Sequence, residues 1–134
     1  MKALSITEPY ASLIRDGVKT IETRSWRTAY RGPLLIHASA TRIPRAWREN
    51  AELMQYVRNV QRGYLLCKAE LVDCVPMTED FIQSLPEAER ATGFYSVGRY
   101  AWVLRNVEPI EPIPAKGRLG IWEYTQEVQH ELSQ

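Results

Sequence analysis

The stretch GVKTIETRSW, residues 17–26, carries the pattern that decides how this chain folds. Gly17 is a typical helix stop, and the alternating, β-branched segment from Thr20 to Arg24 predicts a strand. Because side chains alternate along a strand, Glu22 and Arg24 share one face and Ile21 lies on the other. If Ile21 packs in the core, the two charges face either open solvent or a cleft. An exposed pair contributes only about 0–1 kcal/mol, so the alternatives are a solvated strand face and a binding site.

The segments on either side of this stretch predict a series of short elements. Strands are expected at residues 3–6, 20–24, 34–39, 64–75, 99–106 and 119–124. Helices are expected from the Thr7-Glu8-Pro9 start signal to Gly17, over 44–60 and over 78–85. Residues 90–98 are expected to form a loop, and the prolines within 109–114 an irregular connection. Strands with singly inserted helices predict an α+β protein, a small, partly closed β-barrel of about five to six strands with flanking short helices.

Length and composition predict a single domain over residues 1–126, followed by a polar C-terminal tail at 127–134. No apolar run approaches the roughly 20 residues that a membrane span needs, and nothing resembles a signal peptide. Cys67 and Cys74 lie too far apart along one predicted strand for a disulfide, and two cysteines are too few for a structural zinc site. We therefore expect a cytoplasmic monomer with no cofactor, no metal and no membrane partner.

The net charge of +1 conceals two oppositely charged halves. Residues 1–69 hold 12 Lys and Arg against 5 Asp and Glu, which gives +7, whereas residues 70–134 hold 5 against 11, which gives −6. The arginines between Arg24 and Arg48 are almost free of neighbouring acids, as on a phosphate-binding face. A solvated basic surface that pairs with the acidic half explains the same distribution, and charge alone does not separate the two.

The charged stretch also resembles a known family signature. Gly17, Lys19, Glu22 and Arg24 match the pattern G-x-K-x-x-E-x-R of the ASCH domain (activating signal cointegrator 1 homology), which belongs to the PUA-like superfamily. The segment PYASL at 9–13 is similar to the P-[WY]-A-S-L segment of the family, and later family blocks resemble 63–74, 96–102 and 120–122. The resemblance implies a PUA-like β-barrel with a cleft for RNA or a nucleotide-like ligand.

The residues expected to line this cleft combine donors, one acceptor and an aromatic wall. Lys19 and Arg24 would donate to phosphate or base edges, Glu22 would accept from an exocyclic amine, and Trp26 or Tyr10 would stack on a base. The full set of expected ligand contacts is Lys19, Glu22, Arg24, Ser25, Trp26, Glu8, Tyr10, Arg31, His37, Tyr95, Ser96 and Arg99. His37 is expected in the core or at the rim rather than as a catalyst, and Glu8 stands where family members often carry Gln.

These residues favour an RNA-binding or modified-nucleotide-binding module, and two alternatives stay open. Some small bacterial members of the family deacylate N4-acetylcytidine with a lysine, a threonine and a glutamate. Lys19 matches that lysine, but Glu22 stands at the threonine position, and no motif places the third residue. We expect Glu22 to pair with Lys19 and hold it protonated, which favours binding over hydrolysis. The other alternative is a DNA-binding accessory domain of the transcriptional coactivator type.

Overall fold

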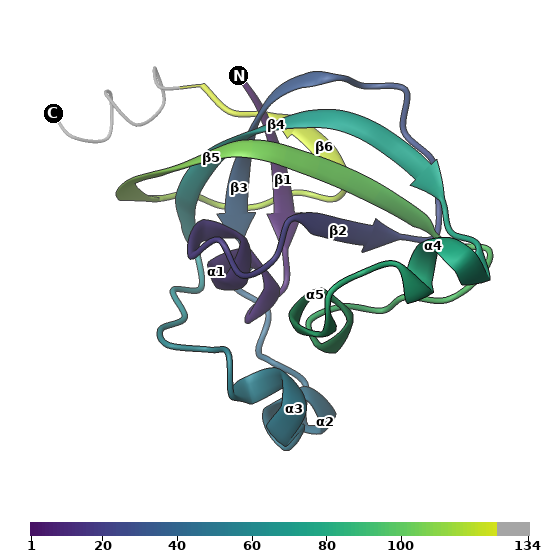
Figure 1. Cartoon of the computed structure of the whole chain (residues 1–134). Coiled ribbons are helices and arrows are strands. Elements are labelled where there is room, and N and C mark those ends of the chain that lie inside the picture. The colour runs from purple at the N-terminus through teal and green to yellow at the C-terminus, as the bar shows by residue number, and fades with distance from the viewer. Residues whose placement is uncertain (126–134) are drawn as a thin grey trace, which may run out of the picture.

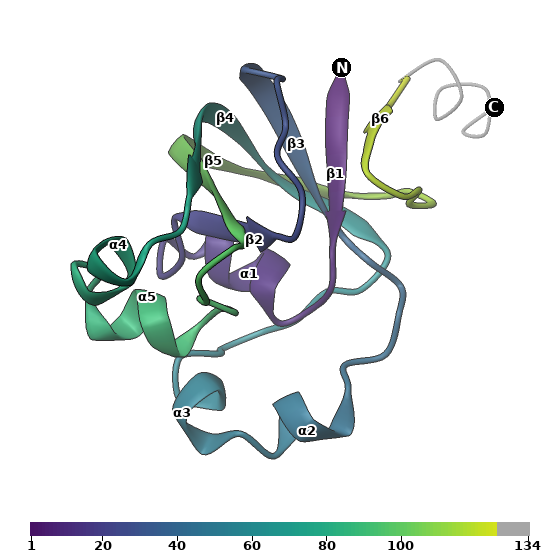
Figure 2. The same ribbon diagram turned by 90° about the vertical axis from the view of Figure 1, so that its right-hand side faces the viewer.

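The computed structural model describes residues 1–125, so the tail expected at 127–134 lies outside the described residues. One curled six-stranded sheet dominates these residues, with α1 inside its curve, α2, α3 and α5 below it and α4 at its side near the end of β2 (Figures 1 and 2). The strands are β1 (Lys2–Ile6), β2 (Ile21–Arg24), β3 (Gly32–Ala38), β4 (Tyr64–Pro76), β5 (Tyr100–Pro114) and β6 (Ile121–Glu123). The helices are α1 (Tyr10–Arg15), α2 (Arg45–Arg48), α3 (Ala51–Met54), α4 (Glu79–Gln83) and α5 (Glu87–Ala91). The α+β class and the expected partly closed barrel of five to six strands with flanking short helices are confirmed.

The strand order is β2-β5-β4-β3-β1-β6, so β2 and β6 form the two edges of the sheet within residues 1–125. Neighbouring strands run antiparallel except β1 and β3, which run parallel. Register shifts between β4 and β5 bend this long pair, and Asn106 has a positive φ of 54° at one of them. Such irregularities increase the curl of a sheet, which brings the two edges toward each other without joining them.

Three sequence predictions of local structure are wrong. The expected helix over 44–60 is two short helices, because Asn50 leaves the helical conformation and caps α3 by accepting from the backbone N–H of Leu53. Residues 87–91, partly assigned to a loop, form α5. The prolines at 109, 112 and 114 lie within β5. They are tolerated because β2 pairs only with residues 100–103 of β5, so the remainder of that edge needs no N–H donors.

The two faces of β2 point as its sequence alternation predicts. Ile21 is buried with Met77 and Ala101 under α4, whereas Glu22 lies on the opposite face. The main core lies between α1 and the sheet and includes Leu13, Ile36 and Trp102. Gly17 has a φ of +79° and ends α1, so the chain turns directly from the helix into Lys19 and β2. Within residues 1–125, none of the helices is long and apolar enough to cross a membrane.

Candidate nucleotide-binding site

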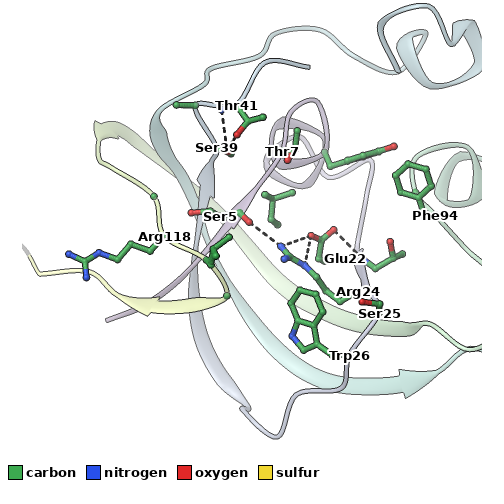
Figure 3. A pocket seen from close by; sticks show the side chains of 18 of the residues that line it. Ser5, Thr7, Glu22, Arg24, Ser25, Trp26, Ser39, Thr41, Phe94 and Arg118 are labelled. Atoms are coloured by element: carbon green, nitrogen blue, oxygen red, sulfur yellow. Dashed lines mark hydrogen bonds and ion pairs between the residues drawn. The ribbon is translucent and has the colours of Figure 1, made fainter. Parts of the chain in front are cut away.

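A cavity of about 660 Å³ opens in the gap between the two sheet edges (Figure 3). Residues of β1 and β2, the ends of the loops after β3 and before β5, and the loop between β5 and β6 line it. Its lining residues are Ser5, Ile6, Thr7, Tyr10, Lys19, Glu22, Thr23, Arg24, Ser25, Trp26, Ser39, Ala40, Thr41, Trp47, Gly93, Phe94, Arg99 and the segment 115–120. This volume accommodates one nucleoside with room to spare.

Lys19 places an unpartnered amine against this cavity. Only 1% of the residue is exposed, and among residues 1–125 no hydrogen-bond acceptor lies within reach of its Nζ. The Nζ atom lies 5.3 Å from the ring centres of both Tyr10 and Tyr95. Burial lowers the pKa of Lys19, while the carboxylates of Glu22 and Glu89 partly oppose that shift. A buried donor without a partner is unusual and costs free energy.

Glu22 pairs with Arg24 instead of Lys19. Arg24 Nη2 lies 2.9 Å from Glu22 Oε2, and the Nε of the same guanidinium donates to that oxygen at 3.1 Å. The same Nη2 also donates to the carbonyl oxygen of Ser5 at 3.0 Å, and Figure 3 shows these contacts side by side. The expectation that Glu22 forms an ion pair with Lys19 is therefore wrong, although its charge still opposes the lowering of the Lys19 pKa. Arg24 shares a strand face with Glu22, so it reaches the carboxylate first.

Aromatic rings stand on two sides of the charged pair. The ring of Trp26, 48% exposed, lies 5.4 Å from the guanidinium carbon of Arg24 and packs edge-on against Trp102. On the other side, Tyr10, Trp47 and Phe94 form a cluster with ring centres 5.0 to 6.0 Å apart. Trp26 and Phe94 border opposite parts of the cavity in Figure 3. Rings in such positions offer flat faces to a base.

A carboxylate that the sequence did not single out lies behind Lys19. Glu89 of α5 is buried, and its oxygens accept from the N–H of Thr20 at 2.9 Å, the hydroxyl of Thr20 at 2.8 Å and the hydroxyl of Tyr95 at 2.9 Å. Burial and the nearby Glu89 raise the pKa of Tyr95, so its hydroxyl stays a donor. Glu89 thus fixes the start of β2 and one ring beside Lys19. Glu89 lies between the helix expected over 78–85 and the loop expected over 90–98, so no sequence signal pointed to it.

The structure brings seven of the expected ligand contacts to the cavity, namely Tyr10, Lys19, Glu22, Arg24, Ser25, Trp26 and Arg99. Arg99 is held there by its hydrogen bonds to the carbonyl oxygens of Phe94 and Thr23. Tyr95 stands behind Lys19, and Ser96 is exposed in the adjacent loop, neither of them on the cavity lining. Arg31 is also outside, because its guanidinium binds the carbonyl oxygens of Thr28 and Tyr30.

Glu8 does not line the cavity either, contrary to the sequence prediction. It is fully buried, and its carboxylate accepts from the N–H of Ser12 at 2.8 Å, the hydroxyl of Ser12 and the N–H of Gln61 at 2.7 Å. The side chain therefore joins α1 to the chain that leads into β4. The expected cap at Thr7 is also absent, since α1 begins after Pro9 without a side-chain cap.

His37 is fully buried and also off the cavity lining. A carbonyl can only accept, so Nε2 carries a proton that it donates to the carbonyl oxygen of Ala115 at 2.7 Å. The hydroxyl of Ser5 then donates to Nδ1 at 3.0 Å, and Trp122 Nε1 donates to the same hydroxyl oxygen. Burial lowers the pKa of His37, consistent with this neutral ring. His37 thus fixes the start of the β5–β6 loop.

Sequence reasoning missed several lining residues. Trp47 was assigned to a longer helix and Phe94 to a loop, and neither residue type signals a site when it lies alone. Thr41, Lys116 and Arg118 also lie far from the signature in sequence. Among residues 1–125, no three His, Cys, Asp or Glu side chains gather closely enough to hold a metal ion.

The curled, unclosed sheet, with a cavity in its gap that is lined by both charged and aromatic side chains, defines a small PUA-like barrel. The chain belongs to the ASCH domain family, whose model matches residues 4–114. Activating signal cointegrator 1 from Homo sapiens is 28% identical over 137 residues, which cover 93% of this chain and 22% of that protein, and the Mus musculus protein gives the same values. The chain thus spans about a fifth of the length of these curated relatives.

Solved structures support the fold. The crystal structure of ASCH from Zymomonas mobilis has a TM-score of 0.57 and 20% sequence identity, and the match covers 98% of this chain and 93% of that one. A mutant of the same protein gives a TM-score of 0.57 and 18% identity, with coverage of 98% and 96%. At this level of identity the likeness concerns the fold.

Proposed function

We propose that this protein binds RNA by taking one unpaired base into the cavity around Lys19, Glu22 and Arg24. The observation that carries this proposal is the unpartnered amine of Lys19 beside a nucleoside-sized cavity with aromatic walls. A buried donor without an acceptor is costly to the free protein. A ligand that supplies a carbonyl oxygen removes that cost, and bases other than adenine carry such an oxygen.

Recognition of the base would combine hydrogen bonds with stacking. Lys19 donates to a ring carbonyl, and the carboxylate of Glu22, which the Arg24 pair holds in place, accepts from an exocyclic amine. Trp26 or Phe94 offers a ring face on either side of the bound base. The coarse link of the ASCH domain family with nucleic acid agrees with this chemistry.

Binding of labelled single-stranded RNA, followed by fluorescence anisotropy, tests the proposal. Trp26→Ala should weaken binding by about tenfold or more, because stacking contributes about 1–3 kcal/mol per base. Lys19→Met should weaken it as well, because methionine cannot donate. Lys68→Met is the matched control, since Lys68 is an exposed lysine of β4 away from the cavity. No RNA affinity, or affinity that these cavity variants leave unchanged, would contradict the proposal. Duplex DNA in the same assay tests the accessory DNA-binding role.

The lowered pKa of Lys19 favours a second candidate, hydrolysis of an N-acylated cytidine or related nucleoside. A neutral amine can take a proton from water or a hydroxyl, whereas the expected pairing with Glu22 would have prevented this. Of the two threonines that flank Glu22, Thr23 lines the cavity, whereas the hydroxyl of Thr20 is held by Glu89, so Thr23 is the candidate nucleophile of that pair. Release of acetate from N4-acetylcytidine, lost in Lys19→Ala and in Thr23→Val, would establish this activity. The absence of turnover at any pH up to the ordinary lysine range would dismiss it.

A further inference from the structure

The loop between β5 and β6 presents a fully exposed leucine at the rim of the cavity. Leu119 is 100% exposed, and no other large apolar side chain among residues 1–125 is as exposed. It contributes to the cavity lining together with Lys116 and Arg118, two exposed cations on the same loop. Neither cation forms an ion pair with any residue in the range 1–125. An apolar tip that directly follows two cations without an ion pair in the range 1–125 is suited to a partner that is apolar inside and anionic outside.

The base of this loop is held rigidly, although its tip is exposed. The N–H of Ala115 donates to the carbonyl oxygen of Gly63, and its own carbonyl oxygen accepts from His37. Gly117 packs so closely that a Cβ there would lie 2.5 Å from Ser5 Oγ and 2.7 Å from Cε1 of His37. Only the tip, which ends at Gly120 with a φ of +65°, projects beyond this support. The backbone just before Leu119 is therefore held in place by the hydrogen bonds of Ala115 and the close packing of Gly117.

The support of the loop is also the support of the binding site. Ser5 uses its hydroxyl to contact His37 and Trp122 beneath the loop, and its carbonyl oxygen accepts from Arg24 in the cavity. In Figure 3 the loop that carries Arg118 and the Glu22–Arg24 pair lie on either side of Ser5. The position of Leu119 relative to the cavity is thus set by direct contacts rather than by a long linker.

We propose that the ligand is a nucleotide extruded from a base-paired RNA helix, and that Leu119 enters the stack at the place its base has left. This inference rests on the proposed function, because it requires the extruded base to occupy the cavity. Lys116 and Arg118 would bind the phosphates on either side of the opened step. The chain thereby selects helical RNA with a weakened pair or a mismatch rather than only a single strand.

The chemistry of a base stack explains the choice of leucine. Removing a base from a helix costs the free energy of unstacking and unpairing, and an apolar side chain that fills the gap recovers part of it. A single strand has no such gap, so it gains nothing from the wedge. Leucine exposed to water in the free protein carries no structural role, because it packs against nothing. Its effect on binding should therefore differ between helical and single-stranded RNA.

A fluorescent adenine analogue whose emission is quenched by stacking reports extrusion directly. The analogue is placed next to a mismatched pair in a short RNA duplex, and the protein is added at low salt. We expect emission to rise several-fold with the wild-type protein, and Leu119→Ala to lose most of that rise and about tenfold in duplex affinity. Val72→Ala is the matched control, because Val72 is an exposed apolar residue of β4 away from the cavity.

The same variants with single-stranded RNA separate this inference from the proposed function. Leu119→Ala should lose much less affinity for the single strand than for the mismatched duplex, because only the duplex offers a gap in a stack. Single-strand binding without any rise in emission from the duplex overturns the wedge and leaves the base-binding cavity intact, whereas binding of neither RNA overturns both. Equal behaviour of Leu119→Ala and wild type on the duplex also overturns the wedge. A DNA duplex with the same mismatch and the same adenine analogue is tested in parallel. A larger rise in emission with DNA than with RNA would identify DNA as the helical partner and contradict the proposal.

Discussion

Replacing Lys19 by methionine should make the protein more stable while it weakens RNA binding. The amine is buried without an acceptor among residues 1–125, and leaving a buried donor unpaired costs about 1–3 kcal/mol. Methionine fills the space of the lysine side chain as far as Cε, lacks the Nζ atom that lies over Tyr10 and Tyr95, and has no charge to desolvate. We therefore expect Lys19→Met to raise the free energy of unfolding by about 1–3 kcal/mol near neutral pH. The opposing contribution is cation–π attraction, which requires the protonated form that burial disfavours.

The pH dependence of this difference follows from the lowered pKa of Lys19. In the unfolded chain the amine keeps its ordinary pKa of 10.5, so between the lowered folded value and 10.5 the unfolded state binds more protons. The stability of the wild type consequently rises with pH across that window. Lys19→Met lacks this dependence, so its advantage should shrink as the pH approaches 10.5.

Urea unfolding followed by tryptophan fluorescence at several pH values measures both effects, with the buried Trp102 as a reporter. The exposed Lys68→Met variant is the control and should change stability by no more than about 0.5 kcal/mol. A Lys19→Met protein that is less stable than the wild type by the same amount at every pH would refute the reasoning. It would mean that the amine has a strong partner in the folded state.

Three further predictions concern the surroundings of the site. Glu8→Ala should lower the free energy of unfolding by about 1.5–3 kcal/mol, because the N–H groups of Ser12 and Gln61 lose the carboxylate that accepts from them. Thermal or urea unfolding measures this loss, and the RNA affinity of the folded protein should not change. Arg118→Gln should make the affinity for single-stranded RNA less dependent on salt. In a plot of log affinity against log salt concentration, the slope should become shallower by about 0.7, the value for one lost phosphate contact. An unchanged slope would exclude that contact. Gly117→Ala should lower stability by about 1–3 kcal/mol in the same unfolding assay, because its Cβ has no space beside Ser5 and His37; a variant as stable as the wild type would show that the base of the loop yields.

Much of the barrel could be predicted from local patterns. Alternation placed Ile21 in the core and Glu22 on the other face, and the same alternation in β4 put Cys67 and Ala69 inside and Lys68 outside. Local signals were weaker where a tertiary contact competes with them. Asn50 divides a periodic stripe because it caps α3, and the prolines of β5 are accepted because that part of the strand lies along an edge without a partner.

The approximate location of the site could be predicted, but the pairing of its charged groups could not. The signature keeps Lys19, Glu22 and Arg24 within a few residues of one another, and short spacing alone brings them to one cavity. Which of the two cations takes the carboxylate depends on side-chain direction, and the structure gives Glu22 to Arg24. Lys19 instead lies between rings from α1 and from the segment before β5, a neighbourhood assembled over more than seventy residues of chain.

The sequence by itself determined the elements and the chemical groups available: short strands, a helix that ends at Gly17, and a cluster of donors with one acceptor at the start of β2. Only the tertiary structure decided which of these groups are buried, paired or exposed. It buried Glu8 and His37 in internal hydrogen bonds, left the amine of Lys19 without a hydrogen-bond partner among residues 1–125 and exposed Leu119 at the cavity rim. The physical reason is one of range. Side-chain alternation and helix capping depend on residues that are neighbours in sequence. Desolvation and hydrogen bonding of a buried group depend on the distant residues that the curled sheet places next to it.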